Sequence, residues 1–85
     1  MANVLMSDEL TINVKHGENT VSVQACYGDY FKVVYEKALE AFGIAPLEGT
    51  KYALYEQTGE KLPKTAQIYN NAEISDGSTI ELKAR

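Results

Sequence analysis

The fold is decided by the stretch Glu9-Leu10-Thr11-Ile12-Asn13-Val14-Lys15-His16-Gly17-Glu18-Asn19-Thr20-Val21-Ser22-Val23-Gln24-Ala25. Apolar and polar residues alternate in its first and last thirds, which is the period of a strand with one buried face. The polar residues 16–19 between these thirds include glycine and asparagine, which suit a hairpin turn. The stretch therefore predicts an antiparallel hairpin with strands over 9–15 and 20–25.

A helix is predicted over residues 30–42, directly after the hairpin. Apolar side chains recur there at the spacing of one helical stripe, at Phe31, Val34, Tyr35, Ala38, Leu39 and Phe42. Asp29 is the expected N-cap, and Gly43 stands where a glycine commonly ends a helix. Such a helix is about 20 Å long, as is a six-residue strand, so it can cover the apolar face of the hairpin.

Three further strands are predicted over 51–56, 61–62 and 79–83, with inward side chains at Tyr52, Leu54, Ile80 and Leu82. Residues 44–50 are expected to form a loop, 58–60 a turn and 64–78 a long irregular connection. The last strand fits best beside the first and parallel to it. This order predicts the α+β class and a β-grasp, in which one helix covers a mixed sheet of four to five strands. The domain spans 9–85, and 1–8 form a flexible lead.

Composition narrows the class of protein. The chain has 85 residues, of which 45% are hydrophobic and 24% charged, as expected for one small globular domain rather than a disordered chain. One cysteine and one histidine cannot make an internal disulfide or a tetrahedral metal site. An iron–sulfur cluster would need about four cysteines. We therefore expect no metal and no other cofactor.

Charge and hydropathy argue against two kinds of partner. Twelve acidic and eight basic residues give a net charge of -4, and the basic residues are scattered between Lys15 and Arg85. A nucleic-acid partner is not expected, because phosphate binding needs clustered positive charge. No apolar run approaches the roughly 20 residues that span a bilayer. The first nine residues have no basic segment followed by an apolar one, so we expect a cytoplasmic protein with no membrane partner.

Two motifs carry a resemblance to a known family. The residues Ile74-Ser75-Asp76-Gly77-Ser78-Thr79-Ile80-Glu81-Leu82 resemble the turn and final strand of the ubiquitin-like family. Tyr52-x-Leu54, followed by residues 58–62, is similar to the middle strand, turn and short strand of that family. The resemblance covers about residues 9–85. It extends to two subgroups, the short bacterial ubiquitin-like domains found with conjugation-like operons and the small ubiquitin-like accessory proteins of bacterial type VII secretion.

The resemblance implies that the protein acts by being bound, as a modifier or as an interaction module. A modifier implies E1-like and E2-like enzymes, a processing peptidase and target proteins as partners. Modifiers and sulfur carriers of the family end in Gly-Gly, whereas this sequence ends in Lys83-Ala84-Arg85. Arg85 aligns with the basic residue that precedes the tail in the family. The tail is thus naturally absent, removed by processing, or missing from the sequence as given.

The resemblance also places a protein-interaction face on the open side of the sheet, away from the helix. By strand position this face carries Ala53, Tyr55, Glu81 and Lys83, which are more polar and aromatic than the aliphatic patch of the family. Cys26 is interpreted as a small buried residue at the end of the second strand, and His16 as a solvated turn residue. No pair of nucleophile and base, no paired carboxylates and no phosphate loop is recognisable, so no catalytic residue and no enzyme is expected.

Two other functions remain open at this point. A structural or assembly subunit, such as a component of a secretion system, could self-associate through the two edges of the sheet. A sulfur carrier is the third alternative, but it requires a C-terminal glycine that this sequence does not contain.

Overall fold

The structure is a computed structural model, and it describes residues 9–70 and 74–85. The predicted flexible lead, 1–8, lies outside the described residues. The elements are, in chain order, β1 (Glu9–His16), β2 (Asn19–Cys26), α1 (Phe31–Phe42), α2 (Pro46–Gly49), β3 (Tyr52–Glu56), β4 (Lys61–Leu62), the 3₁₀ helix η2 (Ile68–Asn70) and β5 (Thr79–Ala84).

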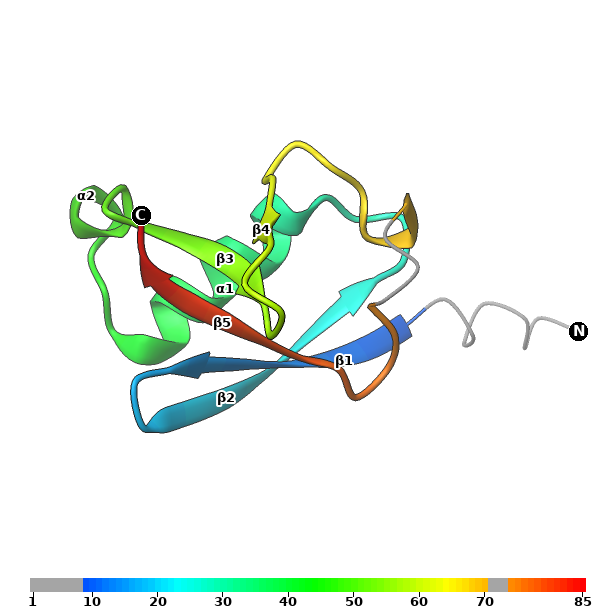
Figure 1. Cartoon of the computed structure of the whole chain (residues 1–85), viewed down its shortest axis with the longest axis horizontal. Helices are drawn as coiled ribbons and strands as arrows, with labels where there is room; N and C mark the ends of the chain where they lie inside the picture. The colour runs from blue at the N-terminus through cyan, green and yellow to red at the C-terminus, as the bar shows by residue number, and fades with distance from the viewer. Residues whose placement is uncertain (1–8, 71–73) are drawn as a thin grey trace, which may run out of the picture.

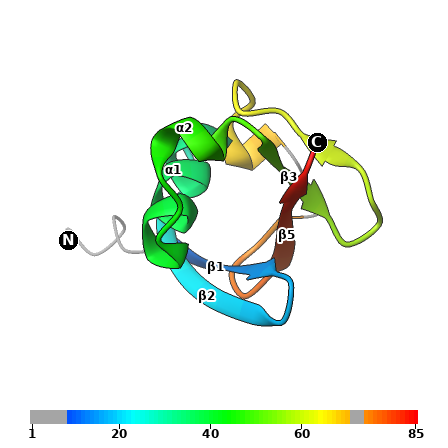
Figure 2. The same cartoon turned by 90° about the vertical axis from the view of Figure 1, so that its left-hand side faces the viewer.

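The five strands form one mixed sheet in the order β2-β1-β5-β3-β4. β5 runs parallel to β1 and antiparallel to β3, and the hairpin β1–β2 is antiparallel. Figure 1 shows the sheet in front of α1, and Figure 2 shows the strands curving around that helix. The β-grasp arrangement predicted from the order of the elements is confirmed, including the central parallel pair.

The core lies between the sheet and α1. The predicted helical stripe is confirmed, since Phe31, Val34 and Ala38 are fully buried. The predicted inward residues of the strands are buried as well, apart from Tyr52, which is half-buried. This thin core is closed from outside the regular elements by two residues of the long connection, Ile68 and Ile74.

The hairpin turn is shorter than predicted. β1 continues to His16, which pairs with Asn19, so only Gly17 and Glu18 lie between the strands. Gly17 has a φ of 63°, a left-handed value that glycine adopts without steric cost. A two-residue loop of this kind matches the twist of the two strands, and it extends the ladder by one more pair.

The predicted N-cap of the helix is wrong. α1 begins at Phe31 with Tyr30 as its N-cap, and no side chain caps it. Asp29 instead accepts a hydrogen bond on Oδ2 from the backbone N–H of Cys26, at 2.9 Å. The N–H groups of Phe31 and Lys32 donate to backbone carbonyls of the long connection. The helix start is therefore satisfied by another segment of the chain, so the carboxylate closes the preceding turn.

Two segments predicted as irregular contain short helices. Residues 44–50 include α2, and 64–78 include η2. The end of the long connection is tied to β1, because the backbone N–H of Thr11 donates to Oδ1 of Asp76 at 2.6 Å. The N–H of Gly77 also donates to the carbonyl of Thr11, at 2.7 Å. These bonds set the point at which β5 enters the sheet.

Candidate protein-interaction face

The side of the sheet that faces away from α1 carries a row of four polar and aromatic side chains. Tyr55 on β3 is paired with Lys61 on β4 and with Glu81 on β5, and Glu81 is paired with Lys15 on β1. Residues opposite one another in a sheet project to the same face. We call this side the open face and define it by Lys15, Ala53, Tyr55, Lys61, Glu81 and Lys83.

Lys83 contacts two other side chains at the centre of the open face. Its Nζ lies 4.9 Å from the centroid of the Tyr55 ring and 3.7 Å from Oε1 of Glu81. Such contacts between partly exposed side chains contribute about 0.5–1 kcal/mol each at most. They place the Lys83 ammonium next to both the half-exposed ring of Tyr55 and the carboxylate of Glu81.

The four residues predicted for this face lie together, but one of them is not accessible. Tyr55 points outward as predicted and is half-exposed, and Lys83 is exposed. Ala53, which is paired with Lys83, retains only 5% of its exposure, so the expectation that it presents its surface is wrong. A methyl group is too short to rise above the longer side chains beside it. Ala53 can act only as the floor of the face.

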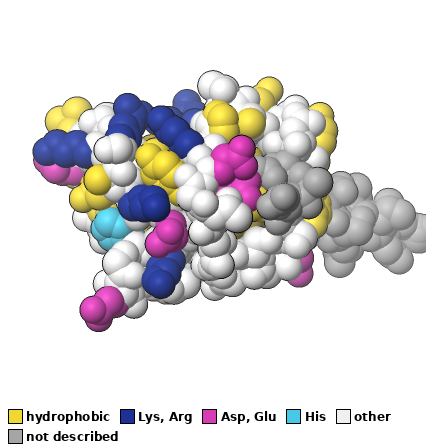
Figure 3. Space-filling model, viewed as in Figure 1, with side chains coloured by type: hydrophobic (Ala, Val, Ile, Leu, Met, Phe, Trp, Pro, Cys, Tyr) yellow, Lys and Arg dark blue, Asp and Glu magenta, His cyan; other side chains and the backbone are white. Residues whose placement is uncertain are grey.

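Positive charge gathers on the open face although the whole chain is acidic. Figure 3 shows Lys and Arg side chains around a small hydrophobic area, with acidic groups between them. Lys15, Lys61 and Lys83 project from three different strands. Arg85 lies at the same end of the sheet as Lys51, since its backbone N–H donates to the Lys51 carbonyl at 3.0 Å.

The predicted position of His16 is wrong. It is half-buried at the end of β1 rather than solvated in a turn. Its Nδ1 lies 2.8 Å from the carbonyl oxygen of Leu82, and its ring centroid lies 5.2 Å from those of Phe42 and Tyr52. His16 therefore continues the apolar stripe of β1 and closes one end of the core.

Cys26 also differs from its prediction. It is exposed rather than buried, at the end of β2, which is an edge strand. It pairs with Glu9 on β1 and lines a shallow hollow together with Lys37. The Nζ of Lys37 donates a hydrogen bond to the carbonyl of Gln24 at 2.7 Å. The nearby charged groups are thus engaged in turn and edge contacts.

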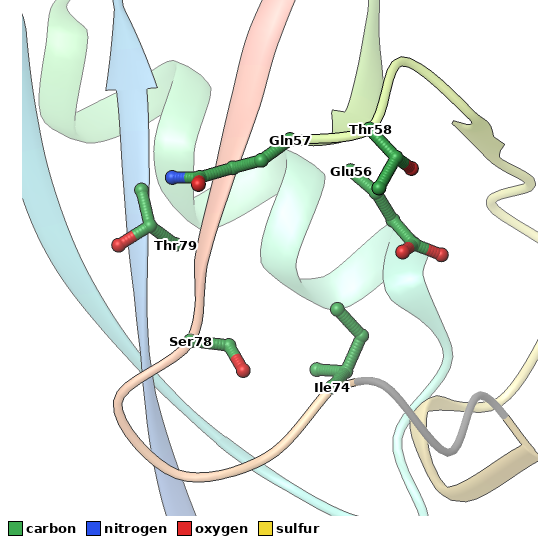
Figure 4. Close-up of a pocket in the computed structure, with 6 residues that line it drawn as sticks. All are labelled: Glu56, Gln57, Thr58, Ile74, Ser78 and Thr79. Atoms are coloured by element: carbon green, nitrogen blue, oxygen red, sulfur yellow. The ribbon is translucent and has the colours of Figure 1, made fainter.

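A small hollow of about 280 Å³ lies where β3 ends and the chain returns to β5. Figure 4 shows its labelled residues coming from the end of β3 and the following turn, and from the segment before β5 and the first residue of β5. The lining includes one carboxylate, Glu56, and three hydroxyls, of which that of Ser78 accepts a bond from the N–H of Ser75. None of the described residues that line it is a histidine, cysteine or lysine that could act as a base or nucleophile.

The part of the chain that the structure describes contains neither a cluster of metal-ligating side chains nor a helix that could span a membrane. No three side chains among His, Cys, Asp and Glu gather in a way that could hold a metal ion. Neither described helix of the α type has the length and apolarity needed to cross a bilayer.

Sequence reasoning missed two residues of the open face, Lys15 and Lys61. Strand parity alone puts both on the outward side, because their neighbours Val14 and Leu62 are buried. The missing information was the register, which places these lysines in one line with Tyr55 and Glu81. Sequence reasoning also missed the burial of Glu56. The available signal was its position two residues after the buried Leu54, which puts both on the same side of the strand.

Several solved structures have folds similar to that of this chain. No family model and no curated protein sequence matches the chain. A protein designed de novo on the basis of ubiquitin has a TM-score of 0.77 at 23% identity, over 92% of this chain and 90% of that one. The N-terminal ubiquitin-like domain of the 4931431F19Rik protein has a TM-score of 0.73 at 15% identity, over 93% and 77%.

A third similar chain comes from the crystal structure of ATBAG1 in complex with HSP70. It has a TM-score of 0.74 at 13% identity, over 88% of this chain and 40% of that one. These identities are too low to carry a function, but the TM-scores of 0.73 to 0.77 show a shared fold. The chain has the ubiquitin-like β-grasp fold.

Proposed function

We propose that this protein is a non-enzymatic ubiquitin-like module that binds other proteins through its open face. The observation that carries the proposal is the half-exposed Tyr55 in the middle of that face, which lies against Lys83 and opposite Glu81. Tyrosine is enriched at interaction hot spots because it offers a large contact area at low entropic cost. The similar chain found in a complex with HSP70 supports a protein partner in general terms.

The chemistry of the described residues supports a binding role better than a catalytic one. The thiol of Cys26 and the imidazole of His16 lie at opposite ends of the hairpin, so they cannot act as a nucleophile and its base. We therefore assign the protein no reaction of its own. The cytoplasmic and bacterial setting inferred from the sequence belongs to the same proposal.

The test of this proposal is a comparison of wild type and Tyr55→Ala. Partners captured on the purified wild-type protein are identified by mass spectrometry, purified and measured by calorimetry. We expect Tyr55→Ala to weaken binding at least tenfold, as for an aromatic hot spot. Glu18→Ala, a change in the exposed hairpin turn, is the matched control. Unchanged affinity of Tyr55→Ala, with an unchanged circular dichroism spectrum, would contradict the proposal.

A second candidate function is that of a protein modifier served by E1-like and E2-like enzymes. It is favoured by the end of β5, where the N–H of Arg85 is bonded to Lys51 at the rim of the sheet. Residues added after Arg85 would leave the folded domain at once and could enter a narrow active site. The gene region that follows the codon of Arg85 tests this function, because conjugation and sulfur carriage both need a glycine there.

A third candidate is an assembly subunit, as in a ubiquitin-like secretion component. β2 supports it, since this edge strand is eight residues long and offers unpaired backbone groups, whereas the other edge, β4, has two residues. Light scattering over a range of concentrations tests it. A constant monomer mass up to millimolar concentration would rule out assembly through the edge.

A further inference from the structure

We propose that the partner segment recognised by the open face is an acidic peptide, lying across the strands along the row Lys61, Tyr55, Glu81 and Lys15. This inference rests on the proposed function, because it names the class of partner for the same face. The evidence for it is the arrangement of the charged side chains on that face, on which the proposed function does not depend.

The cations of the row stand at its two ends. Lys61 is on β4 and Lys15 is on β1, with Tyr55 and Glu81 on the two strands between them. Adjacent strands are about 4.8 Å apart, so the two lysines are about 14 Å apart across the sheet. An extended peptide advances about 3.3 Å per residue. Acidic residues about four positions apart would therefore meet both lysines, and an apolar residue between them would meet Tyr55.

The charges of this face are not balanced within the protein. Among the described residues, the ion pairs are Lys83–Glu81, Lys51–Glu48 and Lys32–Glu36. Lys15 and Lys61 are in none of them. The only carboxylate in the row, that of Glu81, is already paired with Lys83 at 3.7 Å. An incoming acidic segment thus meets two cations without an internal competitor.

The opposite side of the molecule has no such excess of positive charge. The exposed charged residues of α1 are two lysines and two glutamates, Lys32, Glu36, Lys37 and Glu40, and its last turn has no basic residue. A chain of net charge -4 repels an acidic ligand overall. A cationic face on such a chain therefore determines the side from which the ligand approaches. Acidic ligands are steered toward the open face and away from the helix.

At the rim of the face, Arg85 extends the positive field, whereas Lys51 is already paired with Glu48. Arg85 and Lys51 are joined by a backbone hydrogen bond at the end of the sheet where β5 leaves it. Lys83, one strand position before Ala84, lies between this rim and the row. A longer segment that turns out of the row to run along β5 can therefore reach Arg85, which presents a planar guanidinium suited to a carboxylate.

The experiment is a titration of the full chain, labelled with ¹⁵N, with three synthetic nine-residue peptides. The acidic probe is Asp-Glu-Glu-Leu-Asp-Glu-Phe-Asp-Glu, the neutral probe has Asn and Gln in place of the acids, and the basic probe has Lys in their place. We expect amide shifts confined to β1, β3, β4 and β5 with the acidic probe, and at least tenfold weaker binding of the other two. Affinity for the acidic probe falls as salt rises from 20 to 300 mM, because exposed charges are screened.

Charge reversal locates the interaction. Lys15→Glu and Lys61→Glu are each expected to weaken the acidic probe about fivefold or more, as for charges at the rim of an interface. Lys32→Glu, which makes the same charge change on the exposed side of α1, is the matched control and should change affinity less than twofold. All three sites are exposed, so each variant should fold, which circular dichroism checks.

The outcomes separate this inference from the function on which it rests. Equal affinity for the three peptides, shifts on α1, or an equal effect of Lys32→Glu would overturn the acidic partner. If so, a natural partner whose affinity depends on Tyr55 but does not change with salt would still support the proposed function. Tighter binding of a single-stranded oligothymidine than of the acidic peptide would also overturn the inference, since it would make the cations a phosphate site.

Discussion

The Nδ1 atom of His16 lies 2.8 Å from the carbonyl oxygen of Leu82, so the last residue of β1 is bonded to the last inward-facing residue of β5. A carbonyl oxygen only accepts, which means that Nδ1 carries the proton. The ring also packs against Phe42 and Tyr52, from α1 and β3. One side chain thus joins four elements at one end of the core.

We expect His16→Ala to lower the free energy of unfolding by about 2–3 kcal/mol, because it removes ring packing and leaves the Leu82 carbonyl without its donor. His16→Phe keeps an aromatic ring and should cost only about 1 kcal/mol. Urea unfolding followed by circular dichroism measures both. Equal losses for the two variants would show that the hydrogen bond, rather than the ring, dominates, and no loss would refute the role of His16.

Gly43 tests the end of α1. Its φ is 73°, and its N–H donates to the carbonyl of Glu40 at 3.1 Å. Gly43→Ala should destabilise the protein by about 1 kcal/mol, because a side chain disfavours this left-handed conformation. Gly28→Ala is the control, since an added Cβ meets open space at both positions but Gly28 has no positive φ. Thermal unfolding should rank Gly28→Ala equal to or above the wild type.

Asp76 tests the junction between the long connection and the sheet. Its carboxylate accepts from the N–H of Thr11, 65 positions earlier in the chain. Asp76→Ala should cost about 1–2 kcal/mol, and Asp76→Asn should cost less because an amide oxygen can still accept. Glu60→Ala, in an exposed turn, is the control. Hydrogen exchange at the amide of Thr11 should speed up in Asp76→Ala before that of Val14 does.

Ile68 tests whether the long connection belongs to the core. It is completely buried although it lies in η2 rather than in a strand or α1. Ile68→Ala should cost about 2–5 kcal/mol, a large share of the stability of a domain of this size. Leu47→Ala removes a side chain that is 84% exposed and should change stability by less than about 0.5 kcal/mol. Similar denaturant midpoints for the two variants would mean that Ile68 does not pack as described.

The regular elements were predictable because each has a simple period. The alternation in β1 and β2 and the stripe on α1 predicted the buried residues, and the order of the elements predicted that β5 lies parallel to β1. Polar residues that serve tertiary contacts were not predictable in the same way. His16 and Asp29 look like turn and cap residues locally, but their partners, Leu82 and the N–H of Cys26, are set by how the chain is arranged in space.

The candidate site was predictable only in part, for a related reason. Parity along β3 and β5 put Tyr55, Glu81 and Lys83 on one side. It could not show that Ala53 is covered, because burial of a methyl group depends on the length of its neighbours across the strands. Nor could it align Lys15 and Lys61 with Tyr55, since register is a property of pairs of strands.

The parallel pairing of β1 with β5 has a mechanical consequence. β1 is the first described strand and β5 the last, and they lie side by side in the middle of the sheet and point the same way. Tension applied through the two ends of the chain pulls these strands in opposite directions along their length. Their hydrogen bonds are then strained all at once in shear, rather than opened one after another. In a fusion or a tethered assembly, this domain should resist stretching better than its thin core suggests.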